Sequence, residues 1–315
     1  MRHKCICFRD ASGTQDIHAQ LWLPDSAPRA IVQVVHGINE HGGRYASFAQ
    51  YLAVFNIGLA VHDQMGHGDT AAACGRFGYF APQDGWKNLL QDILFFRRQL
   101  VSKFPGLPIF LFGHSMGSFA VRCLLIDDDT AYDGVILSGT GSNPRWLYDF
   151  GLFVCLLARL RHGKEGKSKL LQLLCFGRFA RLFAAEAHPM AWLSRVEQVY
   201  RDYAKDPYCR FLPSISMYRE MFRAMRYMDQ PAGYAKVRRD IPLLLVSGDQ
   251  DPVGGMGKGV SRVYRRYCDA GLQDVELLLY PGGRHEMLHE QNRDEVFGDI
   301  LEWLCARIDR AALPA

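Results

Sequence analysis

The pattern with the clearest chemistry is Gly-His-Ser-Met-Gly at residues 113–117, a serine with glycine two positions before and after it. It follows the apolar run 109–112 and precedes a segment with helical character, 118–126. We predict a tight strand-to-helix turn at Ser115, with glycine on both flanks because larger side chains would collide there. Such a turn lifts the hydroxyl above the sheet edge, where the helix amides stabilise negative charge. The pattern therefore predicts a nucleophilic serine.

A serine hydroxyl needs a base within hydrogen-bond reach, and that base needs an acid to fix its tautomer. On this type of scaffold the order along the chain is serine, acid, histidine, each just after a strand. His285 lies in a glycine-rich loop after the apolar run 275–279, and we predict that it is the general base. Asp249 and Asp251 both follow the run 243–246. Spacing does not separate them: one accepts the bond from the histidine, and the other caps the turn.

The oxyanion of an acyl-transfer intermediate needs two amide donors. The first candidate is the N–H of Met116, directly after the nucleophile. The second lies in the loop 36–43, which follows an earlier apolar run. Gly37 allows this loop to fold back toward Ser115, so the amide of Ile38 is the candidate donor.

The same loop contains His36, Glu40 and His41, which invite comparison with a zinc-binding H-E-x-x-H helix. The spacing differs from that motif and the run follows a strand, so we expect neither a metal ion nor another cofactor. We interpret His114 as a packed, hydrogen-bonded residue, and the segment 62–68 as a structural loop that supports the site from below.

The elements that must position these residues alternate along the chain. Short apolar runs, typical of parallel strands buried on both faces, occur at 31–35, 59–61, 109–112, 135–137, 243–246 and 275–279. Helical patterns separate them, for example 86–104 after a cap at Asp84, and the last helix starts with the capping-box-like pair Asn292 and Glu295. A hairpin of 5–8 with 18–23 precedes them. This alternation predicts an α/β fold with a mostly parallel central sheet flanked by helices.

Residues 141–233 interrupt the alternation, because helical patterns dominate there and no strand is convincing. We expect a core domain of residues 1–140 and 234–315, with 141–233 inserted as a helical cap or lid above the strand ends. The insertion has fifteen Lys and Arg against eight Asp and Glu, a surplus larger than the +4 of the whole chain. Two interpretations stay open: a solvated helical face, or a lid that contacts anionic lipid headgroups.

Composition argues against several classes of protein. The charge of +4 is too small to suggest nucleic-acid binding, and nine scattered cysteines without a C-x-x-C favour free thiols in a reducing compartment. The N-terminus lacks the apolar core of a signal peptide, and the longest uncharged apolar stretch, 150–158, is far shorter than the ~20 residues that span a bilayer. We expect a cytoplasmic protein, peripheral at a membrane if the lid touches lipid. The oligomeric state does not follow from the sequence.

Taken together, several motifs resemble the monoacylglycerol lipase and lysophospholipase branch of the α/β-hydrolases, also called the serine aminopeptidase S33 family. Besides residues 113–117 they are His36-Gly37-x-x-Glu40-His41-x-x-Arg44-Tyr45, Asp63-x-x-Gly66-His67-Gly68 and Gly248-x-x-Asp251-x-Val253. The loop 280–286 is similar to that of bacterial members described as lysophospholipases. The match covers the expected core on both sides of the insertion, but not the insertion in detail.

This resemblance implies an α/β-hydrolase fold with a catalytic triad and no cofactor. It implies Ser115 as nucleophile, Asp251 as acid and His285 as base, with the amides of Ile38 and Met116 as oxyanion donors. One position departs from the family pattern: Thr70 stands where members commonly carry serine, and a hydroxyl is retained.

The residues suggest three functions. The first is hydrolysis of a monoacylglycerol or lysophospholipid ester, because the apolar helices of the insertion suit one acyl chain. The second is an aminopeptidase, which needs carboxylates in the lid to hold an α-ammonium group; the positive surplus argues against it, and Glu186 and Glu197 remain as anchors. The third is a non-catalytic receptor of the same fold, although such proteins usually lack a triad member and here each one is present.

Overall fold

An eight-stranded sheet forms the centre of the computed structural model, which describes residues 1–11, 13–81, 83–127 and 132–311. Its strand order is β1-β2-β4-β3-β5-β6-β7-β8. The hairpin of β1 and β2 pairs antiparallel with β4, and the six strands from β4 to β8 in this order are parallel. The strands are β1 (Arg2–Arg9), β2 (Asp16–Leu23), β3 (Ala30–Val35), β4 (Ile57–His62), β5 (Ile109–His114), β6 (Gly134–Ser138), β7 (Leu243–Gly248) and β8 (Val275–Tyr280).

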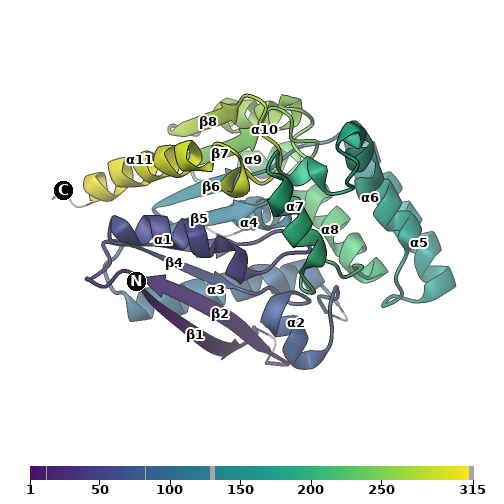
Figure 1. Ribbon diagram of the computed structural model, residues 1–315, viewed down its shortest axis with the longest axis horizontal. Helices are drawn as coiled ribbons and strands as arrows, with labels where there is room; N and C mark the ends of the chain where they lie inside the picture. Colours follow the sequence, from purple (N-terminus) through teal and green to yellow (C-terminus); the bar gives the residue numbers. More distant parts are fainter. Residues whose placement is uncertain (12, 82, 128–131, 312–315) are drawn as a thin grey trace.

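Helices cover both faces of this sheet, and together they give three layers (Figure 1). Helices α1 and α11 pack on one face, and α3, α4 and α10 pack on the other. The helices are α1 (Ala46–Val54), α2 (Gly68–Cys74), α3 (Gly85–Lys103), α4 (Met116–Asp127), α5 (Arg145–His162), α6 (Lys169–Leu182), α7 (Glu197–Lys205), α8 (Ile215–Met228), α9 (Pro231–Tyr234), α10 (Lys258–Asp269) and α11 (Arg293–Ala311). Short 3-10 turns occur at η1 (Gly42–Tyr45), η2 (Ala184–Glu186), η3 (Ala191–Leu193) and η4 (Met287–His289).

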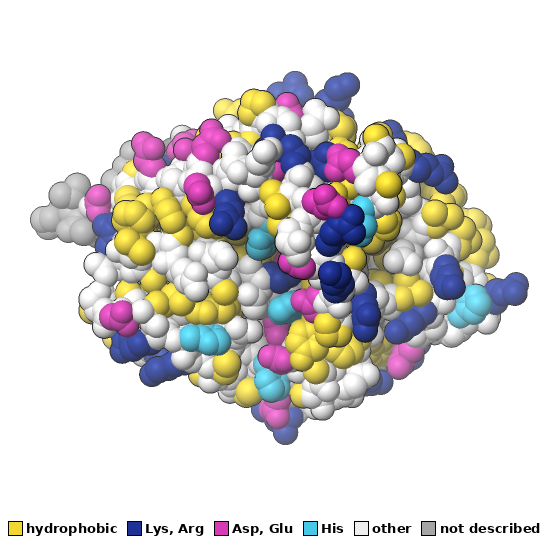
Figure 2. Space-filling view, viewed as in Figure 1, with side chains coloured by type: hydrophobic (Ala, Val, Ile, Leu, Met, Phe, Trp, Pro, Cys, Tyr) yellow, Lys and Arg dark blue, Asp and Glu magenta, His cyan; other side chains and the backbone are white. Residues whose placement is uncertain are grey.

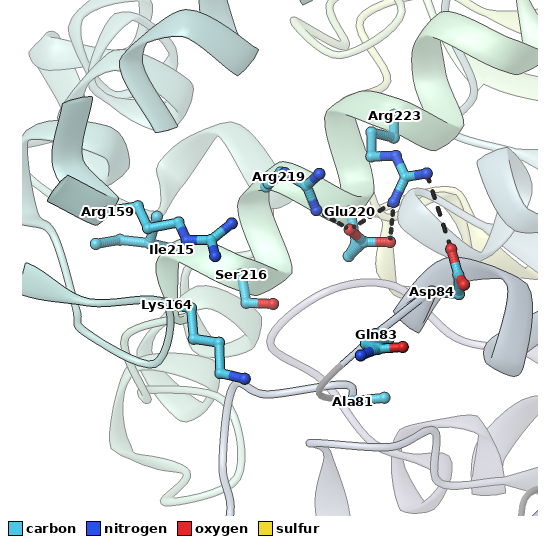
Figure 3. Close-up of a pocket in the computed structure, with 10 residues that line it drawn as sticks. All are labelled: Ala81, Gln83, Asp84, Arg159, Lys164, Ile215, Ser216, Arg219, Glu220 and Arg223. Carbon is cyan, nitrogen blue, oxygen red and sulfur yellow. Dashed lines mark hydrogen bonds and ion pairs between the residues drawn. The ribbon is translucent and has the colours of Figure 1, made fainter. Parts of the chain in front are cut away.

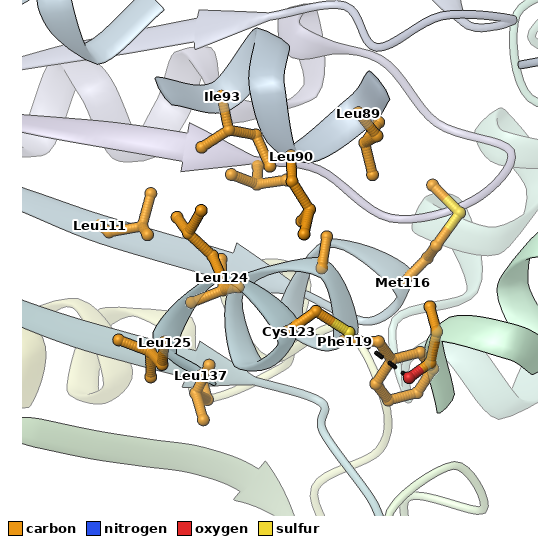
Figure 4. Close-up of a cluster of buried hydrophobic side chains, with 14 of the residues drawn as sticks. Leu89, Leu90, Ile93, Leu111, Met116, Phe119, Cys123, Leu124, Leu125 and Leu137 are labelled. Atoms are coloured by element: carbon orange, nitrogen blue, oxygen red, sulfur yellow. Dashed lines mark hydrogen bonds between the residues drawn. The ribbon is translucent and has the colours of Figure 1, made fainter. Parts of the chain in front are cut away.

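The alternating side chains of the central strands explain why both layers form. In β5, Phe110 and Phe112 belong to the cluster with α1 and α11, whereas Leu111 belongs to the cluster with α3 and α4. Figure 4 shows the second cluster, in which Leu124 of α4 lies between strand and helix side chains. Each fully buried aliphatic side chain contributes about 1.5–3 kcal/mol, so this packing fixes the position of the turn that connects β5 to α4.

Three sequence-based expectations about the periphery are wrong. The run 275–279 was expected to be buried on both faces, but β8 is an edge strand and Leu279 is 39% exposed. One edge of β8 faces solvent, and an apolar run in the sequence does not indicate whether its strand lies at the edge or in the centre of the sheet. Asp84 precedes α3 but makes no capping bond among the described residues, because its backbone is left-handed (φ 47°). At α11, Asn292 bonds to the Glu295 side chain at 2.8 Å, and these side chains do not form the reciprocal backbone bonds of a capping box.

Residues 141–233 are helical, as predicted, and within their range the structure has only an isolated bridge, Lys167 with Ser214, in place of a strand. Helices α5 to α8 stand together at the right-hand end of the sheet (Figure 1). The buried Arg122 of α4 holds this segment: it donates to the carbonyl of Gly141 (2.7 Å) and pairs with Asp229 (2.6 Å). Among the described helices, none is both long enough and apolar enough to cross a bilayer.

Candidate active site

Ser115 occupies the sharp turn between β5 and α4. Its φ of 51° is left-handed, which is uncommon for a residue with a side chain and is typical of strained functional turns. A Cβ on Gly117 would overlap the carbonyl oxygen of Val35, and a Cβ on Gly113 would lie 2.9 Å from the carbonyl oxygen of Gly117. Gly113 is therefore required for the turn to pack against the start of α4, and Gly117 for it to pack against the end of β3.

Asp251 and His285 meet above the ends of β7 and β8. The Nδ1–H of His285 donates to both carboxylate oxygens of Asp251, at 3.0 and 3.1 Å, and both residues are buried. Asp249 points elsewhere and accepts from the amide of Gly282 at 2.8 Å. Of the two carboxylates that spacing left open, Asp251 is thus the one that contacts the imidazole, while Asp249 ties the two loops together.

The electrostatic environment of His285 favours its charged form. Burial alone would lower the pKa of the imidazole, but the Asp251 carboxylate, helped by Glu286 and Glu40, raises it above its ordinary value. His114 packs beside the ring with centroids 4.8 Å apart, and shares a 3.2 Å hydrogen bond with Ser138. Because burial and the neighbouring His285 lower its own pKa, His114 stays neutral.

Ser115 is presented on the turn next to this pair. Its amide donates to the carbonyl of Ser138 (2.9 Å), and the following Gly139 lies against the His285 ring, where a Cβ would be 2.9 Å from Cε1. Within the described residues, no hydrogen bond joins the Ser115 hydroxyl to the imidazole. Catalytic hydrogen bonds are often long in the absence of substrate and shorten when substrate binds. The lack of this bond is therefore compatible with Ser115 as a nucleophile and His285 as its base.

The amides of Ile38 and Met116 lie beside Ser115, and all three residues line one cavity. In the described part of the chain neither amide has an acceptor. The loop of Ile38 approaches the elbow closely, since a Cβ on Gly37 would be 3.0 Å from that of Ser115. These two donors are therefore free to bind an oxyanion.

An ion pair connects the loop of Ile38 to the loop of His285. Arg44 forms two bonds with Glu286, at 2.6 and 2.7 Å, and lies 3.5 Å from Glu40. Burial opposes ionisation of Glu286, but the Arg44 guanidinium outweighs it and lowers the pKa of this carboxyl to about 2. Glu40 accepts from the Gly37 amide. The charged residues of the motif thus brace the backbone around Ser115.

The segment 62–68 supports the same loop from below. The Asp63 carboxylate accepts from the amides of Gly42 (2.7 Å) and Asp69 (2.8 Å). Thr70, the departure from the family pattern, donates to the Asp63 carbonyl at 2.7 Å and accepts from the His18 amide at 2.9 Å. A threonine hydroxyl therefore makes the bonds that the position requires.

A cavity of about 430 Å³ opens at Ser115 and is walled mainly by apolar side chains of α5, α6 and α8. They include Phe150, Val154, Phe176, Phe179 and Phe222. Ligand sites of this size and polarity suit a mainly apolar molecule with a reactive polar end. Arg178 is the charged residue among those described in its wall.

Sequence reasoning missed one contact of His285. Trp192, in η3, packs on His285 with ring centroids 5.1 Å apart, and no periodicity or motif marks it in the sequence. It also missed a group of potential metal ligands among the described residues, His41, Asp206 and Cys209, whose ligand atoms lie within 4.8 Å of one another. His41 already bonds to Asp206 at 3.0 Å, and burial raises the pKa of the Cys209 thiol. This group fits a hydrogen-bonded contact better than a cation site.

Comparison with known proteins identifies the family of the chain. The model of the family described as serine aminopeptidase, S33, matches residues 26–292. The chain belongs to this family. It is 27% identical to a monoacylglycerol lipase of Mycolicibacterium smegmatis over 96% of both chains. It is 31% identical to a monoglyceride lipase homolog of monkeypox virus, over 93% of this chain and 95% of the relative.

A solved structure is similar over nearly its whole length. A thermostable carboxyl esterase from Bacillus coagulans superposes with a TM-score of 0.90 at 30% identity, covering 98% of this chain and 99% of the esterase. The α/β-hydrolase fold expected from the sequence is therefore confirmed. Because the chain belongs to the S33 family and is similar to lipases and an esterase, it is a carboxylic ester hydrolase.

Proposed function

We propose that this S33 hydrolase cleaves the ester of a single-acyl glycerolipid, a monoacylglycerol or a lysophospholipid, through an acyl-enzyme intermediate. Ser115 is the nucleophile, His285 the general base and Asp251 the acid. The amides of Ile38 and Met116 form the oxyanion hole. The observation that carries the proposal is the apolar cavity that opens at Ser115, with the hydrogen-bonded Asp251–His285 pair at its side.

In the acylation step His285 takes the proton of Ser115 as the hydroxyl oxygen attacks the ester carbonyl. The Ile38 and Met116 amides stabilise the oxyanion of the tetrahedral intermediate. When this collapses, the ester C–O bond breaks and His285 gives the proton to the departing glycerol oxygen. Water, deprotonated by His285, then attacks the acyl-serine. The bond between the acyl carbon and the Ser115 oxygen breaks, His285 returns the proton to Ser115, and the fatty acid is released.

Cavity chemistry favours an ester lipid over an N-terminal peptide. An aminopeptidase needs carboxylates for the substrate's α-ammonium, and the described wall of the cavity contains neither Asp nor Glu. The two candidate anchors are engaged elsewhere: Glu186 pairs with Arg284, and Glu197 with Arg201. The relatives named as monoacylglycerol and monoglyceride lipases support the same substrate class.

We further propose that residues 141–233 act as a lid above a core of residues 1–140 and 234–315, and that α5 and α6 dock on an anionic bilayer. Of the sixteen exposed large apolar side chains among the described residues, eleven lie on these two helices. Figure 2 shows apolar atoms gathered at the right-hand edge, with Lys and Arg beside them. We call this the apolar face: Trp146, Leu147, Phe150, Phe153, Leu156, Leu157, Leu160, Leu170, Leu173, Leu174 and Leu182.

Continuity between the apolar face and the cavity supports a path for lipid. Leu147, Phe150, Leu174 and Leu182 belong to both. An exposed surface made of eleven large apolar side chains normally contacts a protein or a membrane. The positive surplus of the segment complements anionic headgroups. An acyl chain can then pass from the bilayer to Ser115 without crossing water.

Docking is tested with Leu156→Glu/Leu160→Glu, which changes the apolar face outside the cavity wall. Sedimentation with vesicles of phosphatidylglycerol and phosphatidylcholine should show about tenfold weaker binding, while hydrolysis of a short soluble ester stays unchanged. Val54→Glu/Val101→Glu, on exposed apolar positions of α1 and α3, is the matched control. Equal vesicle binding by both double variants would remove the docking proposal.

The function is tested by a hydrolysis panel of monoacylglycerols, lysophospholipids, short acyl esters and aminoacyl anilides. We expect the single-acyl lipids to give the highest kcat/KM. Ser115→Ala should lower turnover of a p-nitrophenyl ester at least about 10⁴-fold with the thermal unfolding midpoint retained. Preference for the anilides would replace the lipase assignment with an aminopeptidase, and no turnover of any substrate by the wild type would favour a receptor.

A further inference from the structure

A second cavity, of about 370 Å³, lies beside α8, apart from the residues that wall the substrate cavity (Figure 3). Helix α8 separates the two. Its residues Met221, Phe222 and Met225 face the substrate cavity, while Arg219, Glu220 and Arg223 line the second one. Arg159 at the end of α5, Lys164 in the loop after it and Asp84 just before α3 also line this cavity. Nothing in the ester-hydrolysis mechanism uses these side chains.

Cationic side chains dominate this second cavity. Glu220 is buried at its base and is bonded by Arg219 (2.7 Å) and Arg223 (3.0 Å). Arg223 also lies 3.8 Å from Asp84. Among the described residues, no carboxylate lies within 4.0 Å of Arg159 or Lys164, and Figure 3 shows both side chains on the side of the cavity opposite Asp84. Four cations therefore face two carboxylates.

This arrangement orients donors as well as adding charge. The single carboxylate of Glu220 holds two guanidinium groups side by side, and each guanidinium has further N–H donors in its planar fork. Like charges held together in a concave surface are costly unless an anion joins them. The surplus of two positive charges matches a phosphate monoester, which carries about −1.5 to −2 at pH 7, and is sufficient for the single charge of a diester. Guanidinium forks match the phosphate oxygens in geometry.

We propose that the cavity formed by Arg159, Lys164, Arg219 and Arg223 is a binding site for a phosphate group. Arg159 and Lys164 supply the uncompensated charge, and Glu220 positions the two arginines of α8. Two sources of this group fit the position. Arg159 lies in the last turn of α5, next to Leu160, which is 78% exposed on the apolar face, so a phospholipid headgroup can reach the cavity. Free phosphate or a soluble phosphate ester can reach it from the solvent.

The site is tested on the full chain by calorimetric titration with inorganic phosphate, glycerol 1-phosphate and dihexanoyl phosphatidylglycerol below its micelle concentration. We expect saturable binding of a phosphate compound to the wild type. Arg159→Ala/Lys164→Ala should weaken it about tenfold or more, because two charge-assisted donors are lost. Tighter binding of inorganic phosphate would identify the free anion as the ligand. Tighter binding of the lipid that is lost in Arg159→Ala/Lys164→Ala would identify the headgroup.

Two further variants make the test specific. Arg161→Ala/Lys169→Ala removes the same charge from exposed neighbours outside the cavity and should leave the affinity unchanged. Asp84→Asn removes a carboxylate from the rim and should tighten binding about threefold, because the repulsion between this carboxylate and a bound anion is lost. The variant should fold normally, since asparagine tolerates the left-handed backbone of this position. Thermal unfolding and turnover of a short soluble ester confirm that each variant is folded.

The outcomes are distinct from those of the lipase assay. Equal weakening by both double-alanine variants would mean a general charge effect and would overturn the site. The absence of saturable binding to the wild type for all three compounds would overturn it too, whatever the esterase activity. Loss restricted to the Arg159→Ala/Lys164→Ala variant supports the site even if the substrate of Ser115 proves to be different.

Discussion

The indole of Trp192 lies against the imidazole of His285, with ring centroids 5.1 Å apart and planes inclined by 38°. Trp192 belongs to η3, within the helical segment, whereas His285 follows β8. The backbones are joined as well: the His285 amide donates to the carbonyl of Trp192 (3.4 Å), and the Glu286 amide donates to that of Leu193 (2.8 Å). The proposed base is therefore held partly by the proposed lid.

This contact predicts that Trp192 positions the base. On the other side of its ring Trp192 packs on Phe176 and Phe179 of α6, so truncation would leave a void beside the imidazole. We expect Trp192→Ala to lower kcat for a short soluble ester about 10- to 100-fold, with KM changed less than about threefold. Trp192→Phe should restore most of the rate because an aromatic ring still supports His285.

The pH profile separates positioning from a general loss of structure. Burial is the main effect that lowers the pKa of His285, and Trp192→Ala admits water to the ring. The acidic limb of log kcat/KM should therefore move to higher pH in this variant. An alanine variant with wild-type kcat and an unmoved limb would show that the stacking has no catalytic consequence.

The two aspartates after β7 should differ strongly. Asp251→Asn removes the charge that stabilises the His285 imidazolium and its tautomer, and we expect kcat to fall about 10⁴-fold. Asp249→Asn loses only an acceptor for the Gly282 amide, so its kcat should stay within about tenfold of the wild type. Steady-state kinetics of both variants on one soluble ester measure the difference. The reverse order of damage would reassign the acid.

Local sequence predicted those parts of the site that local sterics determine. The glycines around Ser115 are required by the backbone of the turn itself, and the apolar runs of the parallel strands are required by burial between two helical layers. These constraints act over a few residues, so a single sequence displays them. The family resemblance added the choice of Asp251, which spacing had left open.

Contacts between distant segments cannot be predicted from the local pattern of a single sequence. Asp249 and Asp251 differ in their contacts because the loop after β8 brings the Gly282 amide to Asp249 and the His285 imidazole to Asp251. Trp192 and the cationic cavity depend on how the helical segment folds onto the core, and no period or motif encodes that packing. The exposure of β8 follows from its place at the sheet edge, which its own residues do not specify.

Activity should depend on the protonation of His285, which must be neutral to accept the serine proton. Because Asp251 and nearby carboxylates raise its pKa above 6.5, kcat/KM should rise with pH through a midpoint above 6.5 and then level off. Glu286→Gln removes a nearby carboxylate and leaves Glu40 to compensate the Arg44 charge, so the midpoint should move to lower pH. A wild-type midpoint clearly below 6.5 would contradict this electrostatic account.

Stability should fall in acid because histidines are buried in the neutral form. His62 lies between Phe8 and Phe96, and within the described structure neither ring nitrogen has a hydrogen-bond partner. Burial lowers its pKa from 6.5 to about 4. Between these values the unfolded chain binds a proton that the folded chain does not, so the free energy of unfolding decreases as the pH falls from about 6.5 toward 4.

Replacement of His62 by leucine isolates this contribution. Urea unfolding at pH 7.5 and pH 5 gives the difference in unfolding free energy between the two pH values. A packing cost of the substitution that does not depend on pH cancels in this difference. We expect this change to be about 2 kcal/mol smaller in His62→Leu than in the wild type, the value for a group whose pKa falls from 6.5 to about 4 on folding. Val54→Leu, at an exposed position of α1, is the control that should retain the wild-type pH dependence because it changes no titratable group. Identical pH dependence in wild type and His62→Leu would mean that His62 binds its proton equally well in the folded and the unfolded chain. In that case an acceptor or a water molecule must reach the ring.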